Sequence, residues 1–83
     1  MLIRKPPEVK DSQKEILYQL ADDNLELCLQ IIGTIKLIDK NPGLGELALS
    51  PNLRYYTDDD QKFRITYVVF PDYILVTVIK LLT

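Results

Sequence analysis

Apolar residues recur with two different periods in the two halves of the chain. In residues 8–40 they return every three or four positions, which is typical of amphipathic helices. In residues 53–82 they return at every second position, which is typical of strands that bury one face. This order predicts an α+β fold in which two N-terminal helices pack on a three- to four-stranded antiparallel sheet, within a single domain over residues 1–83.

The first predicted helix covers residues 8–21 and the second covers residues 25–40. Asp23 or Asn24 can cap the second helix, because a short side-chain oxygen accepts a hydrogen bond from a first-turn amide. Asn41-Pro42-Gly43 predicts where it stops. Its apolar positions extend over more of the circumference than a surface helix needs: Leu25, Leu27, Cys28, Leu29, Ile31, Ile32, Ile35, Leu37 and Ile38.

Three strands are predicted after an ambiguous segment at residues 44–50. They cover residues 53–56, 62–70 and 73–82, with turns at residues 57–61 and at Pro71-Asp72. The middle strand alternates, so that one face carries Phe63, Ile65, Tyr67 and Val69 and the other carries Arg64, Thr66 and Val68. The last strand is apolar on both faces. A short strand at residues 2–5, cut off by Pro6-Pro7, would be a fourth.

Composition narrows the range of functions. The 83 residues carry 10 Lys and Arg against 12 Asp and Glu, a net charge of −2, so direct DNA binding is not expected. The start of the chain shows no signal peptide, and the uncharged stretch at residues 73–79 is far shorter than the roughly 20 residues of a membrane span. We therefore expect a soluble, cytoplasmic protein that does not enter a membrane.

The chain also lacks several catalytic residue types. It has no histidine and one cysteine, Cys28, which excludes a histidine base, an internal disulfide and a zinc site built from several thiolates. Cys28 is interpreted as a small buried apolar residue. The acidic run Asp58-Asp59-Asp60 is interpreted as a solvated turn, and no metal or cofactor is expected.

Four segments between residues 8 and 80 follow one another in a characteristic order. They are Ile38-Asp39-Lys40-Asn41-Pro42, Leu53-Arg54-Tyr55, Phe63-Arg64-Ile65-Thr66-Tyr67 and Ile74-Leu75-Val76-Thr77-Val78-Ile79. Together they resemble the RelE/ParE toxin superfamily of bacterial type II toxin–antitoxin modules, whose pattern is a helix that closes on Asn-Pro or Ser-Pro, a strand with an Arg–aromatic pair, an aromatic-Arg-Ile-x-Tyr strand and a final aliphatic strand.

The resemblance suggests catalytic candidates if the chain is a nuclease. In the ribonuclease members, the arginine of the aromatic-Arg-Ile strand faces the substrate phosphate, a position that Arg64 occupies here. Arg54 and Lys62 could join Arg64 in one basic cluster, or Arg64 could pair with the acidic run instead. The chain departs from the pattern because it ends without a basic or aromatic tail and because its middle turn is acidic.

These departures favour binding over cleavage. The resemblance then implies a toxin component, active or degenerate, that binds a cognate antitoxin and a cellular target such as a topoisomerase. Antitoxins of this family wrap their toxin with a helix and an extended segment, and the interface candidates are Leu27, Leu29, Leu37, Leu81 and Leu82. Two alternatives stay open: a ribosome-dependent endoribonuclease of RelE type, and a non-toxic α+β interaction protein that homodimerises through its second helix or a sheet edge.

Overall fold

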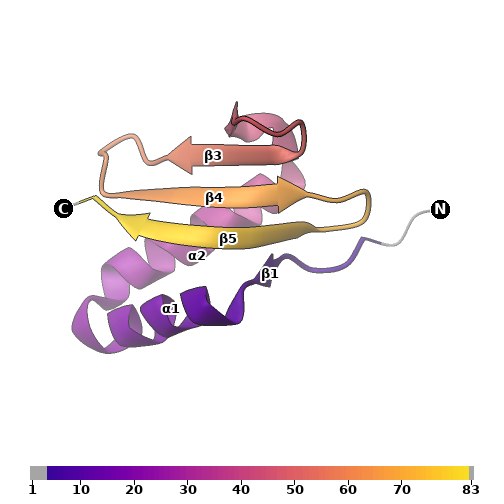
Figure 1. The fold of residues 1–83 in the computed structure, drawn as a ribbon. Coiled ribbons are helices and arrows are strands. Elements are labelled where there is room, and N and C mark those ends of the chain that lie inside the picture. The colour runs from indigo at the N-terminus through magenta and orange to yellow at the C-terminus, as the bar shows by residue number, and fades with distance from the viewer. Residues whose placement is uncertain (1–3, 83) are drawn as a thin grey trace.

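Two helices pack with a five-stranded sheet, and the fold is α+β (Figure 1). The computed structural model describes residues 4–82. Its elements are β1 (Glu8–Val9), α1 (Asp11–Asp23), α2 (Leu25–Lys40), the 3₁₀ helix η1 (Pro42–Leu44), β2 (Glu46–Leu47), β3 (Leu53–Thr57), β4 (Phe63–Val69) and β5 (Ile74–Leu81). The strand order is β1-β5-β4-β3-β2.

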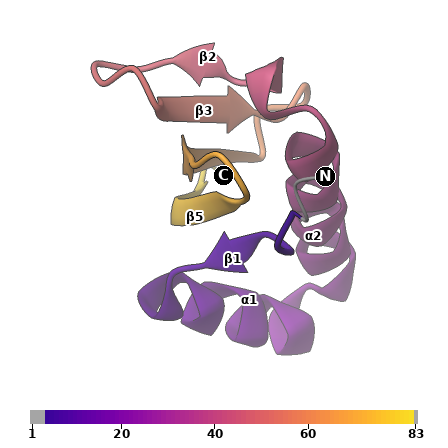
Figure 2. The same cartoon turned by 90° about the vertical axis from the view of Figure 1, so that its right-hand side faces the viewer.

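The sheet is mixed, where the sequence predicted an antiparallel one of three or four strands. Strands β2 to β5 pair antiparallel with their neighbours, but β1 pairs parallel to β5, with Glu8 opposite Leu75 and Val9 opposite Val76. Figure 2 shows α2 along one face of the curved sheet and α1 beside β1, while the opposite face of β3, β4 and β5 carries no helix. Within residues 4–82, no helix is both long and apolar enough to cross a membrane.

The N-terminal segment differs from its prediction. Residues 8 and 9 form strand β1 instead of the first helical turn, and α1 begins at Asp11. Because Pro6-Pro7 favours an extended backbone and the Lys10 amide donates to the Val76 carbonyl at 2.9 Å, the chain enters α1 only after pairing with β5. Of the proposed strand at residues 2–5, residues 2 and 3 lie outside the described part, and residues 4 and 5 are not in a strand.

Helix α2 has the predicted bounds. The Asn24 side chain accepts a hydrogen bond from the Leu27 amide at 3.2 Å, which identifies Asn24 rather than Asp23 as the cap. At the other end, the Asn41 amide donates to the Leu37 and Ile38 carbonyls before Pro42 starts η1. Because sequence signals mark both ends of α2, its bounds can be predicted without knowing its tertiary contacts.

The core lies between the helices and the inward face of β4 and β5. Cys28 is 4% exposed, and Phe63, Ile65 and Tyr67 are fully buried, as the alternation of β4 predicted. In β5 the inward residues are Ile74, Val76 and Ile79, a change of phase caused by a bulge at Thr77, since Thr66 pairs with Val78 but Tyr67 pairs with Val76.

Candidate functional site

The buried Tyr67 hydroxyl joins segments that are far apart in the sequence. It donates a hydrogen bond to the Pro42 carbonyl at 2.7 Å and accepts one from the Gly45 amide at 2.9 Å. Both contacts lie just after α2, so β4 holds the connection between the helical and the strand halves. Two of the segments that resemble the RelE/ParE pattern, Asn41-Pro42 and the strand ending in Tyr67, thus meet at one atom.

Arg54 belongs to the same cluster. Its Nη1 donates to the Gly45 carbonyl at 2.7 Å, and its register partner on β4 is the buried Tyr67, so it lies on the helix side of the sheet. Gly45 has no room for a side chain, because a Cβ there would lie 2.5 Å from the Tyr67 hydroxyl and 2.7 Å from the Tyr55 carbonyl. We missed Gly45 in the sequence, where it lies in the ambiguous segment at residues 44–50.

Arg64 lies on the opposite, uncovered face of the sheet. Its Nε donates to the Thr57 hydroxyl at 3.0 Å, and its guanidinium carbon lies 5.3 Å from the centroid of the Tyr55 ring. The expected alternative, an ion pair with the acidic turn, is not formed among the described residues. Instead, Asp58 accepts a hydrogen bond from the Lys62 amide at 3.4 Å, which closes the turn.

The predicted cluster of Arg54, Lys62 and Arg64 is therefore not formed. Arg54 and Arg64 are on opposite faces, because residues 54 and 64 pair with inward Tyr67 and outward Thr57 respectively. Lys62 precedes β4 and lines a small hollow with the first turns of α2. The register brings Lys80 beside Arg64 instead. We missed Lys80 in the sequence, because the bulge in β5 hides which of its residues face outward.

Tyr55 completes the uncovered face but is poorly suited to accept a proton. The Glu46 carboxylate, as hydrogen-bond acceptor and as a negative charge, raises the pKa of Tyr55, and Arg64 lowers it by less. Its phenol is therefore protonated at neutral pH and acts as a hydrogen-bond donor. Arg64 and Lys80 supply the positive charge of this face, and the Tyr55 phenol, whose hydrogen bond is to the Glu46 carboxylate, is not suited to abstract a proton.

The five leucine candidates fall into two groups. Leu29 and Leu37 are 58% and 51% exposed on the outer face of α2. Leu81 is 40% exposed and lines an apolar hollow of about 280 Å³ with Ile16 and Leu20 of α1. Leu82, whose amide donates to the Lys62 carbonyl at 2.9 Å, follows Leu81, and Leu27 lines the neighbouring hollow at the start of α2. We name the second group, Leu27, Leu81 and Leu82, the corner surface.

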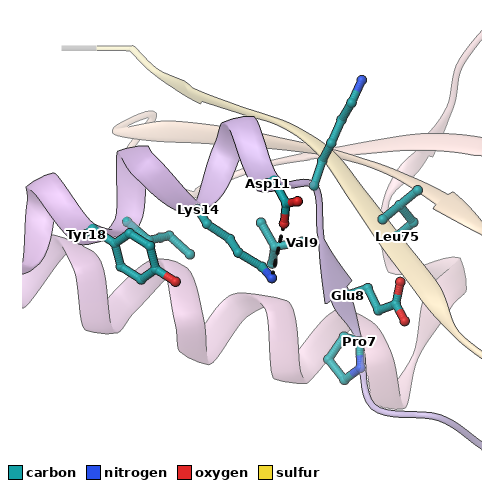
Figure 3. Close-up of a pocket in the computed structure, with 9 residues that line it drawn as sticks. Pro7, Glu8, Val9, Asp11, Lys14, Tyr18 and Leu75 are labelled. Atoms are coloured by element: carbon teal, nitrogen blue, oxygen red, sulfur yellow. Dashed lines mark ion pairs between the residues drawn. The ribbon is translucent and has the colours of Figure 1, made fainter.

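A larger and more open hollow lies beside β1 (Figure 3). Pro7, Glu8 and Val9 form one side, and Lys14 and Tyr18 of α1 form the other. Lys14 is 3.4 Å from Asp11, so its charge is partly neutralised within the same helix. The hollow is therefore a mixed surface at the edge of the sheet without a concentrated charge. Among residues 4–82, no three acidic or thiol side chains are grouped as metal ligands.

Comparison with known proteins identifies no relative: no protein-family model, no curated protein and no solved structure matches this chain.

Proposed function

We propose that this chain is a RelE/ParE-like toxin component, active or degenerate, that acts by binding an antitoxin and a cellular target. The observation that supports this proposal is the contact network at Tyr67. Three of the segments on which the resemblance rests supply its members Pro42, Arg54 and Tyr67. These contacts bring the three segments together at one place in the fold.

The geometry favours binding over cleavage. Arg54 is committed to the Gly45 carbonyl on the helix side of the sheet, so it does not share a surface with Arg64. The phenol next to Arg64 belongs to Tyr55, whose raised pKa suits a donor and not a base. These contacts support a role for the arginines in holding the fold and in recognising a partner.

The corner surface is the proposed antitoxin contact. Leu81 is partly exposed and borders the apolar hollow beside Ile16 and Leu20, where an apolar side chain of a bound segment would displace water. Strand β5 ends at Leu81, and β1 pairs with it only at Leu75 and Val76, so within residues 4–82 the last residues of β5 have no strand partner on that side. An antitoxin segment would therefore insert one apolar anchor here, in the manner of a helix bound in a groove.

Co-expression tests this proposal. The chain is expressed alone and with each short reading frame next to its gene, and growth and co-purification are measured. We expect growth arrest alone, rescue by one neighbouring product, and co-purification of that product. Leu81→Glu should abolish co-purification, whereas Leu49→Glu, a matched change at a fully exposed loop residue, should not. Equal growth in all strains without co-purification would refute the proposal.

A RelE-type endoribonuclease is the second candidate, and the pairing of Arg64 with Lys80 on the uncovered face favours it. Two cations side by side can stabilise the charge that develops on a scissile phosphate. If this candidate holds, Arg64→Ala should abolish cleavage of ribosome-bound messenger, with Lys36→Ala on α2 as the matched control. Unchanged cleavage in the Arg64 variant would remove Arg64 from the mechanism.

A further inference from the structure

Five exposed residues on the outward face of α2 are spaced symmetrically about Gly33. Its members are Glu26, Leu29, Gly33, Leu37 and Lys40, all exposed, at successive spacings of three, four, four and three residues. With 3.6 residues per turn, these spacings keep all five on one stripe of the helix. We name this set the α2 stripe.

Gly33, at the centre of the stripe, has no packing role within the chain. A Cβ at this position would meet nothing within 4 Å, and glycine inside a helix costs roughly 0.5–1 kcal/mol relative to alanine. Glycine does, however, let the backbone of a second helix approach closely. Leu29 and Leu37 flank Gly33 and are 58% and 51% exposed, so they would border such a contact on both sides.

We propose that the α2 stripe binds a second copy of this chain, with the two α2 helices antiparallel and crossing at Gly33. A two-fold axis through Gly33 places Leu29 of each copy against Leu37 of the other. It also places Glu26 of each copy opposite Lys40 of the other, and neither residue forms an ion pair within residues 4–82. The stripe is thus complementary to itself in charge and in apolar contact.

Only the antiparallel arrangement has this complementarity. In a parallel pair, Glu26 would face Glu26 and Lys40 would face Lys40, which is unfavourable. A single helix face buries less than the roughly 800 Å² per partner of a standard interface, so the dimer is concentration-dependent rather than permanent. The inference stands apart from the toxin proposal, because it uses neither the corner surface nor the uncovered sheet face.

A charge exchange tests the arrangement. Sedimentation velocity of the full chain, from roughly micromolar to millimolar concentration, should show a monomer–dimer transition. Lys40→Glu, which places two acidic groups opposite each other, should weaken dimerisation at least tenfold, and Glu26→Lys should do the same. The double variant should restore it. Lys10→Glu, an equal change of charge at an exposed residue outside α2, should leave it unchanged.

Cysteine cross-linking provides a second test at the crossing point. Gly33→Cys should form a disulfide-linked dimer under mild oxidation, while Asp59→Cys on the exposed turn should not. Cys28 is buried at 4% exposure and does not compete. Circular dichroism of each variant is the control that it is folded.

Several outcomes would overturn the inference. A wild-type chain that stays monomeric throughout the concentration range would do so, as would a dimer that the double variant does not restore. So would a monomeric chain whose α2 stripe variants block co-purification with a neighbouring gene product, because the stripe would then belong to that partner.

Discussion

The Tyr67 hydroxyl uses its donor and its acceptor function on two backbone groups that have no other role in the sheet. Without it, the Gly45 amide and the Pro42 carbonyl lose their partner in a part of the molecule where Gly45 is itself buried. A buried backbone group without a hydrogen bond costs about 1–3 kcal/mol. The hydroxyl therefore contributes to stability in addition to the buried ring.

Tyr67→Phe should lower the free energy of unfolding by about 1–3 kcal/mol, because it leaves this donor and this acceptor unpaired while it keeps the ring. Urea denaturation at neutral pH measures the change. Tyr55→Phe, on the uncovered face, is the control and should change stability by less than about 0.5 kcal/mol. Equal effects of the two substitutions would show that the Tyr67 hydrogen bonds contribute nothing specific.

Stability should also depend on Tyr67 at alkaline pH. Burial raises the pKa of Tyr67, while the hydrogen bond from Gly45 and the charge of Arg54 lower it by less. The folded chain keeps this proton at a pH where the unfolded chain, with a pKa near 10.0, has lost it. The contribution is thus complete below about pH 10 and decreases as the pH rises toward the folded pKa.

The measurement is the difference in unfolding free energy between wild type and Tyr67→Phe from about pH 8 to about pH 11. That difference should be constant at first and should shrink above about pH 10, because every ionisable group other than Tyr67 is present in both proteins and its contribution cancels. A difference that stays constant throughout would contradict the assignment.

Single residues could be predicted where one strand decides their environment. The inward face of β4 followed from its own alternation, and Cys28 followed from the apolar stripe of α2. The face of Arg54 could not be predicted, because it depends on the register between β3 and β4. A charged residue also looks like a surface residue unless its backbone partner, here the Gly45 carbonyl, is known.

Secondary-structure elements were predictable where local signals bound them on both sides. Asn24 and Asn41-Pro42 mark the ends of α2, and its bounds agree with the structure. Val9 instead fits two patterns, since an apolar residue before a helix can begin it or can point inward from a strand. Its pairing with Val76 decides the matter, and that partner is far along the chain.

The bulge in β5 depends on a side chain of another element. The Ile79 amide donates to the Gln13 Oε1 of α1 at 2.8 Å, so the helix supplies a hydrogen-bond acceptor next to the point where the ladder changes phase. The apolar sequence around Val78 and Ile79 does not reveal this phase change, because either residue can be buried.

Gln13→Leu should therefore destabilise the fold by about 1 kcal/mol, because the Ile79 amide loses its acceptor. Gln13→Glu keeps an oxygen acceptor, and we expect it to recover most of the loss. Thermal or urea denaturation of the three proteins gives the comparison. Identical stabilities of the leucine and glutamate variants would show that the hydrogen bond does not support the bulge.

The whole molecule is held most firmly at the centre of the sheet. Strand β4 pairs with β5 along its full length and with β3 from Arg64 to Val68, whereas β1 and β2 are two-residue strands at the two edges. Amide hydrogen exchange measured by NMR should therefore be slowest in β4, limited by global unfolding, and much faster in β1 and β2. Equal protection of β2 and β4 would contradict this order.

The α+β class follows from the order of the periodic segments, but the two short edge strands β1 and β2 do not. Both edge strands exist only because a longer strand offers them a free edge, so neither has a pattern of its own. The sequence indicates the layers of the molecule, and the pairing of its first strand with its last needs the three-dimensional arrangement.

The pairing of β1 with β5 joins the first strand to be synthesised with the last. Glu8 and Val9 can form strand β1 only after Leu75 and Val76, their partners in β5, have been synthesised. Until then the emerging polypeptide has two helices whose apolar sides lack the strands that will cover them. On a ribosome that adds roughly 5–20 residues per second, this exposure lasts several seconds. During that interval we expect the nascent chain to be a substrate for chaperones that recognise exposed apolar segments.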